Sequence, residues 1–420
     1  MTFAKVAIFG HGTIGGGVSR ILLTERERLQ KEQNVDIELV AICTKDPEPD
    51  PQFLEEHEHL FAEADDIFAR DDISIVCETI GGTGIAKTFV LNALNSGKHV
   101  VTANKKLIAE YFEELTETAQ KNHVHLLYEA AVGGGIPLLS TISQGLSGDP
   151  IQKIEGIVNG TTNFILTDMD SSGTSFQESL TKAQQKGFAE ADPTDDIEAY
   201  DAVSKLSLLI AKAFGKRIAP EKIPRLGISR IGIADFLYAT ILQKKIKLLA
   251  FAEKTENGIR AEVTPVLLPK SSPLARIDGV LNAVRLTGKY NTAGNMLVGE
   301  GAGRFPTAAA LVSDMISLTH GLSFSHIQEE KTTCLSPEPR AYYLRFVVHD
   351  RPGIVGEIGT IFGKYGISID SVHQAEGQEG TIHFMMTTFP VTWEVFEQAR
   401  KEGEACSFHA KPPLILPLWK

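Results

Sequence analysis

Apolar and polar positions in the first 130 residues follow two alternating patterns. Short apolar runs rich in β-branched residues, such as "KVAIFG", "VDIELVAICT", "ISIVCET" and "HVVTA", are separated by segments with helical spacing, the first of which extends to about Glu32. Strands that alternate with helices are typical of right-handed βαβ units and a parallel sheet. The pattern therefore predicts a doubly wound α/β domain over residues 1–130.

The pattern changes after Glu129, where the glycine-rich run "AAVGGGIP" is followed by the β-like "IEGIVNG" and a long helical region. Further on, "GIRAEVTPVLL" and "GVLNAVRLTG" have the composition of strands. We expect residues 131–300 to form an α+β domain with a second sheet. The glycine-rich turn and amphipathic helix of "GEGAGRFPTAAALVSDMISL" predict a segment, about 300–325, that returns to the first domain.

A polar, proline-bearing stretch at 326–340 is typical of a linker. Beyond it, residues 341–420 show the order β-α-β-β-α-β, beginning with "YYLRFVVHD" and continuing through "ISIDSV" and "TIHFMMTTF". The chain is thus expected to end in a third, small α/β domain. Its 420 residues exceed what one hydrophobic core usually serves, which agrees with two or three domains.

Charge and cysteine content narrow the class of protein. A formal net charge of -12 argues against a surface for nucleic acid or anionic membrane. The four cysteines lie far apart with no CxxC pair, so neither a zinc site nor a disulfide framework is indicated. The sequence shows no leader pattern and no apolar run of transmembrane length, and we expect a cytoplasmic protein that acts on small molecules.

The motif "GHGTIG" directly follows the first predicted strand and opens a helix, which is the Rossmann-type context for a dinucleotide. Its candidate cofactor-binding residues are Gly10, Gly12, Thr13, Ile14 and Gly15. The second strand ends in "CTK" and not in an acidic residue for the ribose hydroxyl, so Lys45 favours NADP, with NAD left open. The alternative is that Lys45 is a solvated loop residue.

Two lysines are candidates for chemistry. Lys105 follows the strand "HVVTA" at the carboxyl edge of the predicted sheet, where it could touch cofactor and substrate or simply face water. In "FAEADPTDDIEAYDAVSKL", six carboxylates precede Lys205, and Asp201 shares its helical face at i, i+4. That pair is either a surface ion pair or a half-buried proton donor with its partner. In a straight helix, Asp196 would lie on the opposite side from Lys205.

Six segments, "GHGTIGGGV", "GKHVVTANK", "YEAAVGGGIP", "GIVNGTTNFIL", "GFAEADPTDDIEAYDAVSKLSLL" and "GEGAGRFPTAAALVSD", resemble homoserine dehydrogenases in motif and order. The segment "HDRPGIVGEIGTIFGKYGISIDSVHQ" resembles an ACT domain, a small regulatory domain that takes up amino acids. The resemblance implies reversible reduction of L-aspartate 4-semialdehyde to L-homoserine with NADPH or NADH, in threonine and methionine biosynthesis. It also implies that residues 131–300 serve catalysis and dimerisation.

By position, the resemblance implies that Lys205 is the catalytic proton donor and Asp201 its electrostatic partner. Glu190 would hold the substrate ammonium. Asp196, Thr161 and Lys105 would contact the substrate, and Lys105 would also contact the cofactor. The resemblance also implies that an alkali cation such as Na⁺ or K⁺ binds to oxygens of Glu129, Val132, Gly134 and Ile136. The chain departs from the family at Phe188, where many members have tyrosine, and at "CTK", where members selective for NADP often carry arginine.

The resemblance further implies an amino-acid effector, with threonine the expected one, at the ACT domain, and a homodimer or homotetramer. The alternative for this domain is a role in dimerisation alone. Two rival functions stay open from the residues: an amino-acid dehydrogenase of similar architecture with another substrate, and a non-catalytic sensor of nucleotide and amino acid. Retention of Lys205 and Asp201 argues against a sensor, because a sensor needs no proton donor.

Overall fold

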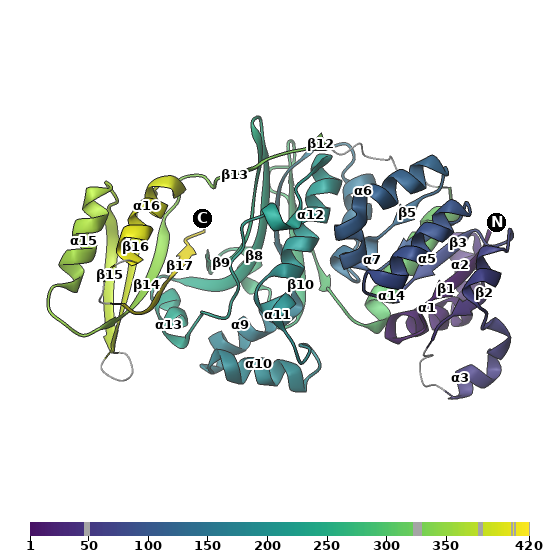
Figure 1. Ribbon diagram of the computed structural model, residues 1–420, viewed down its shortest axis with the longest axis horizontal. Helices are drawn as coiled ribbons and strands as arrows, with labels where there is room; N and C mark the ends of the chain where they lie inside the picture. The colour runs from purple at the N-terminus through teal and green to yellow at the C-terminus, as the bar shows by residue number, and fades with distance from the viewer. Residues whose placement is uncertain (46–50, 322–329, 377–380, 405, 407–408, 420) are drawn as a thin grey trace. The chain divides into compact units, whose positions relative to one another are not determined.

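The computed structural model describes residues 1–45, 51–321, 330–376, 381–404, 406 and 409–419 (Figure 1). The chain forms two compact units. The first comprises Met1–Gln152, Ser204–Pro220 and Val284–Lys331, and the second comprises Lys153–Val203, Glu221–Ala283 and Thr332–Lys420. Within the described residues, the helices are all too short or too polar to cross a membrane.

The first unit contains a parallel five-stranded sheet with the order β2-β1-β3-β4-β5, as the alternating pattern predicts. Its strands are β1 (Thr2–Phe9), β2 (Val35–Cys43), β3 (Ile75–Glu78), β4 (His99–Thr102) and β5 (Leu126–Leu127). The helices and turns among them are α1 (Thr13–Thr24), α2 (Arg26–Gln33), α3 (Pro51–Glu56), η1 (Glu58–Leu60), α4 (Ala64–Phe68), α5 (Gly84–Asn95) and α6 (Lys105–Lys121). The helix expected to run to about Glu32 is two helices, because the backbone leaves the helical region at Glu25 (φ -105°, ψ 6°).

A late segment, α14 (Arg304–Thr319), completes the core of the first unit. It packs on α1 so closely that a Cβ at Gly17 would lie 3.1 Å from Cβ of Ala308. Leu311 and Met315 on α14 are fully buried among the residues of β1 and β2. Burial of this apolar face holds α14 against a sheet that begins roughly 300 residues earlier in the chain.

The second sheet is mixed, with the order β11-β10-β6-β8-β9-β13. Its strands are β6 (Ile151–Ile157), β8 (Lys244–Thr255), β9 (Gly258–Pro269), β10 (Leu281–Gly288), β11 (Asn295–Glu300) and β13 (Cys334–Leu335). The remaining elements between Glu129 and Lys331 are α7 (Glu129–Gly133), α8 (Leu138–Ser140), η2 (Thr141–Gly145), α9 (Gly160–Ser172), α10 (Phe176–Gln185), α11 (Thr194–Ile197), α12 (Tyr200–Phe214), β7 (Lys216–Arg217), η3 (Pro220–Lys222), α13 (Ile233–Ile241), η4 (Pro273–Arg276) and β12 (Glu330–Lys331). The predicted second sheet is therefore present.

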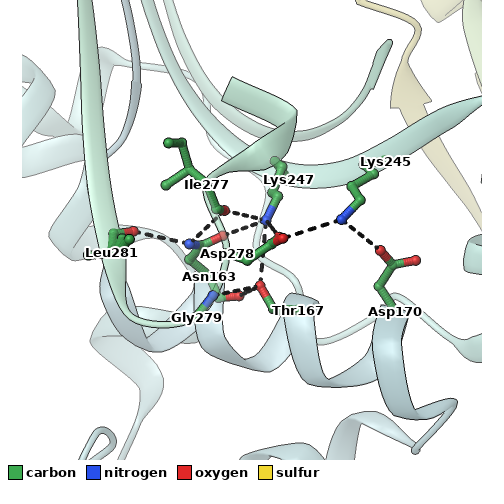
Figure 2. Close-up of polar contacts among 9 residues, drawn as sticks. All are labelled: Asn163, Thr167, Asp170, Lys245, Lys247, Ile277, Asp278, Gly279 and Leu281. Atoms are coloured by element: carbon green, nitrogen blue, oxygen red, sulfur yellow. Dashed lines mark hydrogen bonds and ion pairs between the residues drawn. The ribbon is translucent and has the colours of Figure 1, made fainter. Parts of the chain in front are cut away.

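A buried lysine fastens α9 to the second sheet (Figure 2). Lys247, 2% exposed on β8, donates through Nζ to Asn163 Oδ1 at 3.0 Å and to Ile277 O at 2.5 Å. It also pairs with Asp278 at 2.9 Å, while burial lowers the Lys247 pKa. Because a buried ammonium costs free energy when it lacks partners, the hydrogen bond of Lys247 to Asn163 fixes the position of α9 on β8.

The C-terminal domain has the predicted β-α-β-β-α-β order and forms an antiparallel sheet, β15-β16-β14-β17. Its elements are β14 (Tyr342–His349), α15 (Ile354–Lys364), β15 (Ile369–Glu376), β16 (Thr381–Thr388), α16 (Trp393–Glu404) and β17 (His409–Pro417). A core that includes Phe346, Phe362 and Phe396 fills the space under the two helices. Residues 326–329 of the expected linker lie outside the described residues.

Candidate active site

The glycine loop of the first unit has the geometry that a pyrophosphate requires. Gly10 has φ +93°, and a Cβ there would lie 2.9 Å from the backbone at Thr79 and Ile80. A Cβ at Gly15 would lie 2.0 Å from Gly10 O, whereas a Cβ at Gly12 would meet nothing within 4 Å. Gly10 and Gly15 therefore allow close packing, and Gly12 leaves open space beside the N-terminus of α1, where backbone N–H groups favour an anion.

His11 ties this loop to the end of β2. Its backbone N–H donates to Thr44 Oγ1 at 3.1 Å, next to the exposed Lys45. Its ring, only 2% exposed, contacts Ser19 Oγ through Nε2 at 2.9 Å and stacks on Phe53. Burial, with a smaller contribution from the charge of Arg304, lowers the His11 pKa, so the ring beside the loop is held neutral at pH 7. The glycine motif alone does not indicate a role for His11.

Lys105 begins α6 at the same sheet edge as the glycine loop. In the register of the sheet, Phe9 lies beside Glu78, and Glu78 lies beside Thr102. Asn104 caps α6 by accepting from Leu107 N at 3.1 Å and donates to Gly82 O at 2.7 Å. Lys105 is half-buried, whereas the neighbouring Lys106 is exposed. This difference in burial separates two lysines that the sequence could not distinguish.

The run "YEAAVGGGIP" forms α7 and a tight turn, and its one carboxylate accepts two backbone hydrogen bonds. Glu129, 5% exposed, accepts from Leu139 N and Ser140 N, each at 2.7 Å. Asp314 Oδ2 in turn accepts from Glu129 N at 3.1 Å. Burial and the charge of Glu129 raise the Asp314 pKa strongly, and burial lowers the pKa of Lys212 nearby.

The four residues expected to bind an alkali cation occur in or just after α7. Glu129 and Val132 lie within the helix, Gly134 follows it with φ +57°, and Ile136 O accepts from Leu138 N at 2.8 Å. Among the described residues, no group of three or more His, Cys, Asp or Glu side chains could hold a metal ion. A cation here would therefore depend mainly on backbone oxygens, so the expected site stays a prediction.

In the second unit, Asn159 joins the two carboxylates that the sequence could not place together. Its Nδ2 donates to Asp196 Oδ1 at 2.7 Å and to Asp201 Oδ2 at 2.8 Å. Its Oδ1 accepts from Thr162 N at 2.9 Å and so caps α9. The side chain is 4% exposed, so these are buried, charge-assisted hydrogen bonds.

The helix is broken between Asp196 and Asp201, so a straight helical wheel does not apply to Asp196. The break falls at Ala199, which is buried and has φ +65°, so Asp196 lies on α11 and Asp201 on α12. Asp201 and Lys205 do share α12 as predicted, and they are only 4% and 8% exposed. Because both side chains are buried, Asp201 and Lys205 do not form a solvated surface ion pair.

Thr161 lies on the first turn of α9 and donates through Oγ1 to Phe188 O at 2.6 Å. Phe188 is 40% exposed and meets Phe164 edge to face. Glu190, two residues on, is exposed, and among the described residues its carboxylate has no protein partner. The fold thus leaves the carboxylate of Glu190 exposed two residues after the Phe188 carbonyl that Thr161 contacts.

Family models match three consecutive parts of the chain. They are the homoserine dehydrogenase NAD binding domain over residues 10–129, homoserine dehydrogenase over 137–316, and the ACT domain over 342–402. These matches cover both the glycine loop and the Asn159 to Lys205 region.

Curated relatives and a solved structure extend the similarity to nearly the whole chain. Homoserine dehydrogenases from Neisseria gonorrhoeae and Pseudomonas aeruginosa are 38% and 37% identical, over 88% and 92% of both chains. The crystal structure of a homoserine dehydrogenase from Thiobacillus denitrificans, 34% identical, matches with a TM-score of 0.90 over 100% of this chain and 99% of that one. The chain therefore belongs to the homoserine dehydrogenase family of NAD(P)-dependent oxidoreductases and carries a C-terminal ACT domain.

Proposed function

We propose that the chain interconverts L-aspartate 4-semialdehyde and L-homoserine with Lys205 as the proton donor to the aldehyde oxygen. The observation that carries this assignment is the bridge of Asn159 to Asp196 and Asp201, one helical turn before the buried Lys205. A desolvated ammonium close to fixed carboxylates can stabilise and protonate a developing alkoxide. The membership in an enzyme family also weighs against the two rival functions, the sensor most of all.

The other polar residues have roles in binding. When bound, the dinucleotide supplies the hydride that reduces the aldehyde carbon. Glu190, with its carboxylate exposed, would bind the substrate ammonium, while Asp196 and Thr161 would contact the rest of the substrate. Lys105, half-buried at the sheet edge, would hold the substrate close to the nicotinamide.

NADP is the proposed cofactor, with NAD as the alternative. The loop Gly10, Gly12, Thr13, Ile14 and Gly15 would hold the pyrophosphate of either one. Lys45 is exposed directly after β2, where its ammonium can reach a 2′-phosphate. The ratio of kcat/KM for NADP to that for NAD measures this preference directly.

Assembly as a homodimer or homotetramer in the cytoplasm completes the proposal, with threonine as the expected effector at the ACT domain. Three apolar residues on one face of α13, Ile233, Leu237 and Ile241, are 41%, 66% and 60% exposed. Such a stripe is typical of an interface with a second copy. An alkali cation bound through oxygens of Glu129, Val132, Gly134 and Ile136 stays part of the proposal.

Replacement of Lys205 tests the assignment. Initial rates with L-homoserine and NADP, followed by the absorbance of the reduced nicotinamide, should show that Lys205→Ala lowers kcat by roughly 10²- to 10⁴-fold. The dissociation constant of the dinucleotide should change little. Lys106→Ala, which removes an exposed lysine, is the matched control and should behave as the wild type. Near-normal turnover of Lys205→Ala would exclude Lys205 as the proton donor.

A further inference from the structure

Glu78 is a buried carboxylate in the first unit, beside the point where the strand order of the parallel sheet reverses. It is the last residue of β3, which lies between β1 and β4 in the order β2-β1-β3-β4-β5. Its neighbours in the sheet are Phe9 and Thr102, the last residues of those two strands. Open α/β sheets bind ligands outside the carboxyl ends of the strands at such a point. Because Glu78 is 0% exposed, it borders this position without being able to touch a ligand.

The loop after β3 folds back onto this carboxylate. Glu78 Oε1 accepts hydrogen bonds from Ile80 N at 2.8 Å and from Gly81 N at 3.2 Å. Gly81 and Gly82 have φ +81° and +66°, whereas a Cβ at either one would meet nothing within 4 Å. The two glycines are therefore needed for the backbone conformation that directs these N–H groups to Glu78, and not for close packing.

The same loop is joined to the glycine motif on its other side. Thr79 donates through N to Phe9 O at 2.9 Å and through Oγ1 to Gly10 O at 2.7 Å. A Cβ at Gly10 would lie 2.9 Å from the backbone of Thr79 and Ile80, so the two segments are in close contact. The side chain of Glu78 takes no part in these contacts, and its replacement should leave the glycine loop in place.

Glu78 is connected to Lys105 through two buried polar residues. Thr102 Oγ1 donates to Glu78 Oε2 at 2.5 Å and accepts from Asn104 N at 2.9 Å. Asn104 Nδ2 donates to Gly82 O at 2.7 Å and lies 3.5 Å from Glu78 Oε1. Asn104 is also the N-cap of α6, and Lys105 is the first residue of that helix. The network therefore fixes the start of α6 to the loop after β3.

We propose that Glu78 is a positioning residue that fixes Lys105 relative to the glycine loop and so affects the binding of the substrate. Its two oxygens accept from the loop that is joined to Gly10 and from the residues that are joined to Lys105. A buried network of this kind holds a site in place only while its members are paired. The part assigned to Lys105 rests on the dehydrogenase function proposed above, whereas the network itself does not.

Hydrogen exchange of the unliganded full-length chain tests the network without any ligand. Glu78→Gln keeps the shape of the side chain but replaces one acceptor oxygen with an NH₂ group. The amide of Leu107, which donates to Asn104 Oδ1 at 3.1 Å, should then exchange at least about tenfold faster than in the wild type. An unchanged rate would refute the positioning role.

Asp36→Asn is the matched control. Asp36 lies near the start of β2, at the opposite edge of the same sheet, and its carboxylate pairs with Arg26 at 2.6 Å. The variant removes a carboxylate from the same unit without a change at the carboxyl ends of the strands. The exchange rate of Leu107 and the activity should both stay at the wild-type level.

Binding without turnover tests the effect on the substrate. L-homoserine and NADPH do not react with each other, so calorimetry of L-homoserine added to the enzyme–NADPH complex measures affinity alone. Glu78→Gln should weaken this binding by about tenfold. The Kd of NADPH, from the fluorescence of the nicotinamide, should change by less than about threefold, because the contacts of Thr79 with Gly10 remain. A loss of affinity for NADPH alone would contradict the proposal.

A double-mutant cycle separates positioning of Lys105 from a general structural effect. Glu78→Gln alone should lower kcat/KM for homoserine by about 10- to 100-fold, the cost of a misplaced group. Added to Lys105→Ala, it should cause a further loss of less than about threefold, because the group that it positions is already absent. Losses that multiply in the double variant would overturn the proposal.

Thr102→Val provides a second route to the same result if Glu78→Gln does not fold. It removes the hydroxyl that lies between Glu78 and Asn104 N. It should show the same faster exchange at Leu107 and the same lack of additivity with Lys105→Ala. Thr102→Ser, which keeps the hydroxyl, should recover most of the loss. Multiplying losses, or no recovery with serine, would contradict the network.

Failure of this proposal and failure of the dehydrogenase function give different results. An active wild-type enzyme in which Glu78→Gln changes neither the exchange of Leu107 nor the affinity for homoserine refutes the positioning role alone. A wild-type protein without turnover or homoserine binding, in which Glu78→Gln still accelerates the exchange of Leu107, supports the network and refutes the dehydrogenase function.

Discussion

Asn159→Asp should make the stability of the second unit strongly dependent on pH. The change keeps an oxygen to accept from Thr162 N, so the cap of α9 survives. It replaces the two N–H groups that serve Asp196 and Asp201 with a third carboxyl group. The perturbation is therefore confined to the bridge that holds the two carboxylates together.

The size of the effect follows from the geometry. Two hydrogen bonds to charged groups are lost, each contributing about 1.5–3 kcal/mol. A carboxylate at position 159 would also be repelled by those of Asp196 and Asp201. For one pair of charges 4 Å apart, at an effective dielectric constant of about 20, this repulsion is about 4 kcal/mol. The introduced carboxyl will instead hold a proton, so its folded-state pKa lies above the unfolded value of about 3.9. Its stability contribution is present below that value and is lost as pH rises through the folded-state pKa.

Urea unfolding at pH 5.5 and at pH 8 measures this difference. The deficit of Asn159→Asp relative to the wild type should be larger at pH 8 by at least about 1.4 kcal/mol, which corresponds to one unit of pKa. Asn159→Ser keeps a capping oxygen, adds no charge and should show a deficit that is the same at both pH values. Equal deficits for Asn159→Asp at the two pH values would refute the bridging role of Asn159.

Three further predictions address other parts of the site. Glu190→Gln should raise the KM for homoserine, because it removes the charge that would bind the substrate ammonium. The Tm should not change, because the carboxylate is exposed. An unchanged KM would argue against the contact with the ammonium. Burial raises the pKa of Asp314, so the stability that it contributes falls as pH rises above the unfolded-state pKa of an aspartate, about 3.9. Asp314→Asn should flatten the dependence of Tm on pH above that value, and an unaltered profile would contradict this. Gly15→Ala should lower Tm, because the new Cβ would lie 2.0 Å from the backbone oxygen of Gly10. Gly12→Ala should fold normally and lose affinity for the dinucleotide. Equal Tm values for the two variants would contradict the close packing at Gly15.

The sequence was sufficient for features that depend on local pattern. The alternation of strands and helices predicted the parallel sheet, and the "GHGTIG" motif predicted a loop between a strand and a helix, which lies between β1 and α1. The i, i+4 spacing predicted that Asp201 and Lys205 share a helix, which α12 confirms. Each of these predictions rests on residues that are close together in the chain.

Features that depend on distant residues could not be predicted. The break at Ala199 is held by Ile228 N, which donates to Ile197 O, and by Gly227, where a Cβ would lie 2.4 Å from that same oxygen. The position of Asn159 after a strand and before a helix does suggest an N-cap. Its bond to Asp201, 42 residues away, requires the folded chain. The buried Lys247 likewise has a sequence context that gives no sign of burial.

The left-handed backbone at Ala199 bears on the order in which the protein folds. Residues 194–214 contain no proline or glycine, so an isolated chain can form one continuous helix through this stretch. That helix would point Asp196 away from Asp201. The native conformation of Ala199 costs about 1–2 kcal/mol, which the packing of Gly227 on Ile197 and the bridge of Asn159 help to offset. We therefore expect the carboxylates of Asp196 and Asp201 to come together late, after the strand and helix on either side of Asn159 have docked.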